Sequence, residues 1–126
     1  MSLSTNLLDA LSPKNRIFVA FSGGLDSTAL LFLCNKALKE KKIRNLKAIH
    51  INHNLSKNSD NWQQHCESFC RGNNIEFESF MVEVSKNRSS IESQARQARY
   101  KIFESLLDEN DQILLAHHRD DVFETI

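Results

Sequence analysis

The order of hydrophobic and polar residues predicts short buried strands that alternate with amphipathic helices. Apolar runs typical of buried strands occupy residues 16–21, 46–52, 75–84 and 112–116. In the other segments, apolar residues recur every three or four positions, as on one face of a helix. The predicted helices cover residues 3–11, 27–40, 60–73 and 91–107, and a further helix is expected to begin near Asp120.

Apolar strands that alternate with helices favour an α/β fold with right-handed crossovers. We therefore predict a Rossmann-like, doubly wound parallel sheet with helices on both faces. In such sheets, ligands bind at the carboxyl ends of the strands. Polar residues follow three of the predicted strands, at positions 22–27, 52–53 and 117–121, and we expect the functional site there.

The composition is that of an ordinary globular domain, with 126 residues, of which 40% are hydrophobic and 25% charged. No apolar run approaches the ~20 residues that span a bilayer, and the N-terminus lacks a signal-peptide pattern. We therefore expect no membrane partner. Sixteen basic side chains balance sixteen acidic ones, which does not indicate attraction of the whole chain to nucleic acid. Three cysteines without a secretion signal are typical of a cytoplasmic protein.

The segment Ser22–Ser27 (SGGLDS) joins the first predicted strand to the following helix. Its two glycines let the backbone turn sharply and approach a ligand, and amides at a helix N-terminus favour an anion. The segment lacks the lysine of a Walker A motif. Asp26 would repel phosphates unless a cation lay between them, which suggests Mg²⁺. Alternatively, this is a Gly-Gly turn in which Asp26 or Ser27 caps the helix.

The segment from Phe21 to Thr28 resembles the PP-loop of the N-type ATP pyrophosphatases, which cleave ATP between the α and β phosphates. This resemblance implies an adenine nucleotide alpha hydrolase-like fold with strand order 3-2-1-4, extended by a fifth strand in the complete family fold. It also implies that ATP and Mg²⁺ are bound, with the loop holding the pyrophosphate portion.

Three further segments resemble one branch of that group, the tRNA(Ile)-lysidine synthetases. Residues 50–55 (HINHNL) are similar to H-x-N-H-x-L, and residues 90–100 are similar to S-x-E-x-x-A-R-x-x-R-Y. Residues 116–125 are similar to A-H-H-x-D-D-Q-x-E-T and depart from it at Val122, where the family has Gln. Tyrosine, arginine and histidine positions of these motifs all match.

Taken without the resemblance, these segments leave alternatives open. The two histidines His50 and His53 straddle opposite strand faces and could simply be hydrogen-bonded structural residues. Arg96 and Arg99 share a helix face, where they can bind phosphates or form a solvated basic surface. On the helix expected after Asp120, Asp121 and a glutamate three residues later could hold Mg²⁺ through water.

The resemblance and the loop chemistry together give a set of candidate site residues. The candidate catalytic residues are Asp26, His53, His117, His118 and Asp121. The candidate ATP-binding residues are Ala20, Phe21, Ser22, Gly23, Gly24, Leu25, Asp26, Ser27, His50, Ile51, Arg96, Arg99 and His117. The candidate magnesium ligands are Asp26, Asp121 and Glu124.

The resemblance implies ATP-dependent ligation of free L-lysine to C2 of the wobble cytidine of isoleucine tRNA with a CAU anticodon. An adenylated intermediate forms, and pyrophosphate and then AMP are released. The alternatives are another PP-loop enzyme, such as a tRNA thiolase or an amidotransferase-type ligase, and a nucleotide-binding module without turnover. The paired C-x-x-C cysteines expected of a thiolase are not present.

Residues 1–126 are expected to form the N-terminal PP-loop domain of a longer protein, with tRNA-binding domains beyond Ile126. The helix expected after Asp120 would have under two turns, and the family's fifth strand would be missing. Residues 112–116 would then form an open apolar edge. Such an edge predicts self-association through the edge strand or a homodimer, and no lysidine formation by this segment alone.

Overall fold

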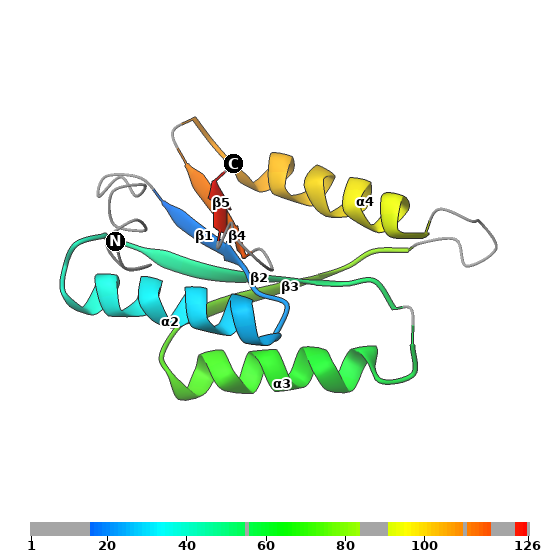
Figure 1. The fold of residues 1–126 in the computed structure, drawn as a ribbon, viewed down its shortest axis with the longest axis horizontal. Helices are drawn as coiled ribbons and strands as arrows, with labels where there is room; N and C mark the ends of the chain where they lie inside the picture. The colour runs from blue at the N-terminus through cyan, green and yellow to red at the C-terminus, as the bar shows by residue number, and fades with distance from the viewer. Residues whose placement is uncertain (1–15, 55, 84–90, 110, 117–122, 126) are drawn as a thin grey trace.

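The computed structural model describes residues 16–54, 56–83, 91–109, 111–116 and 123–125. Within these residues, a five-stranded sheet has the order β3-β2-β1-β4-β5 (Figure 1). Its strands are β1 (Ile17–Ala20), β2 (Leu46–Asn52), β3 (Glu76–Met81), β4 (Gln112–Ala116) and β5 (Phe123–Thr125). The first four strands pair in parallel, which confirms the predicted order 3-2-1-4. The helix predicted at residues 3–11 lies outside the described residues.

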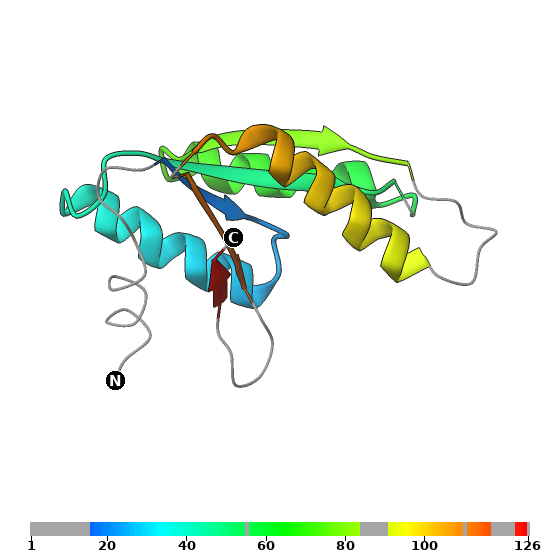
Figure 2. The same ribbon diagram turned by 90° about the horizontal axis from the view of Figure 1, so that it is seen from above.

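Three helices connect these strands, and they cover both faces of the sheet as predicted. They are α2 (Leu25–Lys39), α3 (Ser59–Gly72) and α4 (Ile91–Leu106). Helices α2 and α3 lie on one face, and α4 lies on the other (Figures 1 and 2). In the part of the chain that the structure describes, no helix is long and apolar enough to cross a membrane.

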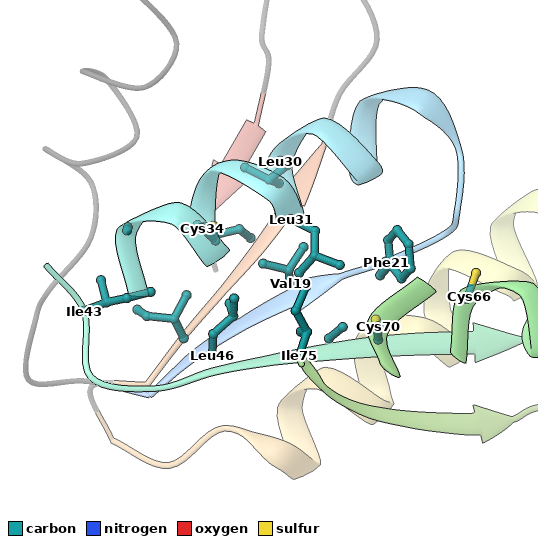
Figure 3. Packing of buried hydrophobic residues seen from close by; sticks show 14 residues of the cluster. Val19, Phe21, Leu30, Leu31, Cys34, Ile43, Leu46, Cys66, Cys70 and Ile75 are labelled. Carbon is teal, nitrogen blue, oxygen red and sulfur yellow. The ribbon is translucent and has the colours of Figure 1, made fainter. Parts of the chain in front are cut away.

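Alternate residues of the central strand supply two separate hydrophobic cores. Val19 of β1 and Phe21, which directly follows the strand, pack beneath α2 and α3, together with Leu31 and Cys34 (Figure 3). Phe18, on the opposite side of the same strand, joins the core that contains Phe103 of α4 and Ile113 of β4. Each large apolar side chain buried in this way contributes about 1.5–3 kcal/mol to folding. The period-two alternation of β1 therefore supplies side chains to both cores.

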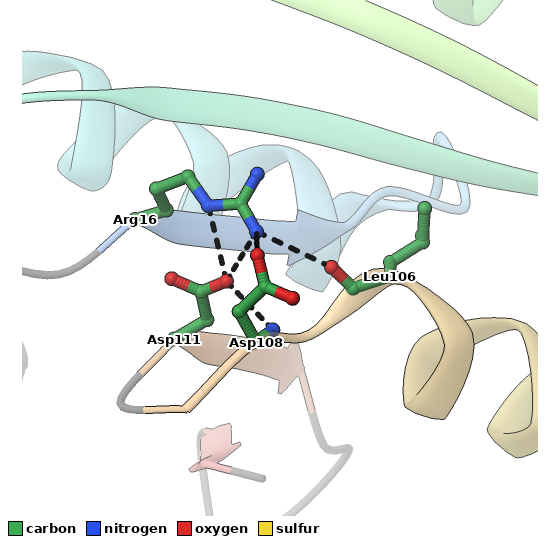
Figure 4. Close-up of polar contacts among 4 residues, drawn as sticks. All are labelled: Arg16, Leu106, Asp108 and Asp111. Atoms are coloured by element: carbon green, nitrogen blue, oxygen red, sulfur yellow. Dashed lines mark hydrogen bonds and ion pairs between the residues drawn. The ribbon is translucent and has the colours of Figure 1, made fainter.

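The amino-terminal ends of β1 and β4 are joined by ion pairs around Arg16 (Figure 4). Its Nε donates to Asp111 Oδ2 at 3.0 Å, and its Nη2 lies 2.9 Å from Asp108 Oδ2. The hydrogen bond from Arg16 lowers the pKa of Asp111, while burial opposes that change to a smaller extent. This cluster lies at the amino ends of β1 and β4, whereas ligands bind at the carboxyl ends of such strands. Its role is therefore structural.

The expectation of a helix from near Asp120 to Ile126 was wrong at residues 123–125, and so was the expectation of a fully open β4 edge. The rest of that predicted helix lies outside the described residues. Residues 123–125 form β5, which pairs antiparallel with β4 through Leu114↔Thr125, Leu115↔Glu124 and Ala116↔Phe123. Aromatic and β-branched residues such as Phe123 and Thr125 favour a strand, and the backbone groups of β4 offer hydrogen-bonding partners. The carboxyl-terminal half of the β4 edge is therefore covered within the chain.

Candidate functional site

A cavity of about 490 Å³ opens at the carboxyl ends of β1, β2 and β4. This volume lies in the range of small-molecule and nucleotide sites. Eleven residues of the predicted site line it: Ala20, Phe21, Ser22, Gly24, Leu25, Asp26, Ser27, His50, Ile51, His53 and Arg99. The sheet topology thus brings the glycine loop, the two histidines and one arginine together, as expected of parallel strand ends.

The loop between β1 and α2 is held in shape by its own hydroxyl groups. Ser22 Oγ and Ser27 Oγ lie 2.9 Å apart, and the backbone N–H of Ser22 donates to Ser27 Oγ at 3.2 Å. Gly24 occupies the N-cap position, which shows that neither Asp26 nor Ser27 caps the helix. The first turn of α2 lines the cavity, and no side chain at the N-cap accepts from its amides, so the positive end of this helix favours an anion there.

Gly23 cannot be replaced by another residue without strain. Its φ is +86°, in the left-handed region that side chains disfavour. A Cβ there would lie 2.7 Å from Cys66 Sγ and 2.9 Å from Trp62 Cζ2. The loop backbone therefore rests directly against α3. Gly24 differs, because the nearest atom to its Cβ position is Ser22 Oγ at 3.5 Å, an ordinary contact.

His50 is a buried, hydrogen-bonded residue that also lines the cavity. Its Nδ1 lies 2.9 Å from the carbonyl oxygen of Phe21. A carbonyl only accepts, so Nδ1 carries a proton and donates it to this bond. The imidazole also stacks on Phe77, with ring centroids 6.3 Å apart. The interpretation of His50 as a hydrogen-bonded structural residue is therefore only partly correct. The same hydrogen bond also fixes its ring at the wall of the cavity.

His53 and Arg99 contribute polar atoms that lack partners among the described residues. His53 Nδ1 and Arg99 Nε are both buried without a hydrogen bond. Burial lowers the pKa of His53, and the nearby charge of Arg99 and then of His50 lowers it further. Unpaired buried polar groups are costly, and a bound polar ligand would relieve that cost.

The two arginines predicted to act together lie in different surroundings. Arg99 lines the cavity, whereas Arg96 does not. The Arg96 guanidinium stacks over the Tyr100 ring at 5.1 Å and donates to its hydroxyl oxygen at 3.4 Å. Arg99 approaches the same ring at 5.9 Å. Both guanidinium groups therefore contact Tyr100, but only Arg96 also forms a hydrogen bond with it.

Two further residues shape the cavity: Asn52, which the sequence placed in the expected site region without a role, and Trp62, which it did not single out for the site. Asn52 is buried and donates from Nδ2 to Asp60 Oδ1 at 3.0 Å and Gln63 Oε1 at 2.9 Å, which ties the end of β2 to α3. Its position at a strand end was a usable signal. Trp62 shares the apolar stripe of its helix with Cys66 and Cys70, yet Trp62 is 45% exposed while both cysteines are buried.

The candidate magnesium ligands are only partly described by the structure. Asp26 lines the cavity in the first turn of α2. His117, His118 and Asp121 lie outside the described residues, and Glu124 lies in β5 rather than on a helix. No group of three metal-binding side chains occurs among the described residues. Mg²⁺ is commonly held by one or two carboxylates together with substrate phosphates, and Asp26 beside the loop suits that arrangement.

Comparison with known proteins agrees with this geometry. The chain is 43% identical over 124 residues to a tRNA(Ile)-lysidine synthase of Legionella pneumophila, and 42% identical over 127 residues to that of Pseudomonas syringae. In both cases 98% of the chain is matched but only 28% of the relative's length. The fold resembles a U34-tRNA thiolase of Methanococcus maripaludis, with a TM-score of 0.64 and 23% identity, over 86% of this chain and 39% of the thiolase. Residues 2–126 match the PP-loop domain family. The chain therefore belongs to the PP-loop family.

Proposed function

We propose that the chain forms the ATP-binding part of a tRNA(Ile)-lysidine synthetase. The observation that carries this proposal is the joining of the glycine loop, His50, His53 and Arg99 in one cavity, in a chain similar to lysidine synthases over 98% of its length. The reaction would ligate free lysine to C2 of the wobble cytidine in isoleucine tRNA with a CAU anticodon.

The reaction would proceed in two steps, and the loop acts in the first of them by binding the phosphates of ATP. The cytosine O2 attacks the α-phosphate of ATP, and pyrophosphate leaves. The loop amides and the N-terminal end of α2 bind the pyrophosphate portion, while Arg99 neutralises phosphate charge. Asp26 would hold Mg²⁺, which, when bound, offsets the charge that develops on the phosphate oxygens.

In the second step the lysine amine attacks C2 of the base, and AMP leaves. The amine has an ordinary pKa of about 10.4, so a base must remove a proton from it. We propose His53 for this role, because it lines the cavity and its lowered pKa favours the neutral imidazole that can accept a proton. His117 and His118, the other two candidates, lie outside the described residues. His50 is a weaker candidate, since its Nδ1 proton is committed to the Phe21 carbonyl.

We further propose that residues 1–126 act as the N-terminal PP-loop domain of a longer cytoplasmic protein. The chain spans 28% of the length of the lysidine synthases that it matches. Additional domains would supply most of the tRNA contacts, which is consistent with the formal net charge of zero here.

The test uses the intact protein that carries these residues, with ATP, Mg²⁺, lysine and transcribed tRNA. Pyrophosphate release and lysidine formation are followed with each component omitted in turn. We expect lysidine only in the complete mixture and only with the CAU anticodon, and a GAU transcript is the control. Asp26→Asn should reduce pyrophosphate release at least about tenfold, and the exposed Glu67→Gln on α3 should not. Lysidine formation without ATP, or pyrophosphate release that does not need tRNA, would contradict the proposal.

A further inference from the structure

We infer that Trp62 is a positioning residue that holds the phosphate loop in its binding conformation. This inference rests on the proposed ATP-binding role of the loop. Trp62 lies in the first turns of α3, lines the cavity and contacts the loop directly. It is the only tryptophan in the chain. Its position links a helix that lies after β2 to the loop that follows β1.

The contact is a direct hydrogen bond. Trp62 Nε1 donates to the carbonyl oxygen of Ser22 at 2.6 Å. The indole ring also stacks on His65, one turn further along α3, with ring centroids 4.8 Å apart and an interplanar angle of 19°. The Nε1 hydrogen bond, and not this stacking, joins the indole to the Ser22 carbonyl.

The hydrogen bond determines how the loop backbone faces. The Ser22 carbonyl and the Gly23 N–H belong to one peptide unit, which is planar, and the described residues contain no cis peptide bond. With the carbonyl held toward Trp62, the Gly23 N–H must point to the opposite side. Gly23 then adopts φ +86° and lies against Trp62 and Cys66, so the conformation of the next peptide is constrained as well.

The loop is thus held from two sides. The hydroxyl pair of Ser22 and Ser27 fastens it to α2, and Trp62 fastens it to α3. Without the indole N–H, a bound phosphate would itself have to order the Ser22–Gly23 peptide, and that entropy cost would appear as weaker binding. The cost of one neutral hydrogen bond corresponds to a loss of about three- to tenfold in affinity.

The experiment compares Trp62→Phe with the wild type in the intact protein. Phenylalanine keeps an aromatic ring but cannot donate to Ser22. We expect the Kd of Mg·ATP and of inorganic pyrophosphate, measured by calorimetry, to rise about three- to tenfold. The KM for ATP should rise similarly, while the KM for lysine stays unchanged. His65→Ala is the matched control, since it removes the stacked ring but keeps the indole N–H, and it should change either Kd less than about twofold.

A purely structural role would give a different result. Loss of folded protein lowers the number of binding sites and kcat but leaves Kd and KM for ATP unchanged. Unchanged affinity in Trp62→Phe, or an equal loss in His65→Ala, would overturn the inference. Because binding is measured without tRNA or lysine, a protein that binds ATP but forms no lysidine would refute only the proposed reaction. A wild-type protein that binds neither ATP nor pyrophosphate would refute both.

Discussion

Gly23 and Gly24 are neighbours in the loop, but the structure constrains them differently. Gly23→Ala places a Cβ 2.7 Å from Cys66 Sγ at φ +86°, whereas Gly24→Ala meets only Ser22 Oγ at 3.5 Å. We expect Gly23→Ala to lower the free energy of unfolding by about 1–3 kcal/mol. Gly24→Ala should change it by less than about 0.5 kcal/mol. Urea unfolding of both variants measures the difference, and equal values would contradict it.

The pKa of His53 offers a second test at the scale of single residues. Burial lowers it first, and the positive charge of Arg99 lowers it further because a cation disfavours the imidazolium form. In an NMR titration of the ligand-free protein, we expect His53 to titrate below the ordinary value of 6.5. Arg99→Gln should move that titration to higher pH by removing the charge. A shift to lower pH, or no shift, would show that Arg99 does not act on His53.

At the scale of elements, the ion pairs of Arg16 join the beginning of β1 to the turn before β4. The pKa of Asp111 is lowered from its ordinary value of 3.8 in the folded state. Its ionised form therefore stabilises the fold above about pH 4, and this contribution is lost as the pH falls through the folded-state pKa. Asp111→Asn should lower the Tm at pH 7, and the difference from wild type should shrink between pH 4 and pH 2. A difference that is constant with pH would exclude an electrostatic origin.

At the scale of the whole molecule, the three thiols report on the integrity of the core beneath α2 and α3. Burial raises the pKa of Cys34 and Cys70 to about 12 and that of Cys66 to about 11. All three are free and buried, so they should not react with a thiol reagent at pH 8 until the core opens. We expect three reactive thiols in denaturant and none within minutes in native buffer. Rapid labelling of one cysteine alone would instead reveal local opening of its helix.

The strands, helices and loop of this protein were predictable from the sequence because their signals are local. Residues 46–52 and 112–116 were predicted as strands with the bounds that the structure shows. The cavity position followed too, since parallel strands bring their carboxyl ends to one edge. The error at residues 123–125 arose because a three-residue strand is too short to show a period of its own, and its formation depends on backbone pairing with β4. Acidic residues before Phe123 resembled a helix start, and the open edge expected at residues 112–116 was not matched to the short segment that covers part of it.

By itself, the sequence determined the buried faces, the element order and the chemistry of the glycine loop, since these depend on periodicity and residue type. Only the tertiary structure decided which neighbour each side chain meets. Arg96 and Arg99 share a helix face in sequence, but only Arg99 lines the cavity. Trp62 belongs to an apolar stripe, but its indole N–H bonds to Ser22, forty residues earlier. Periodicity indicates the side of a helix that is covered, whereas the contact itself depends on how α3 crosses the sheet.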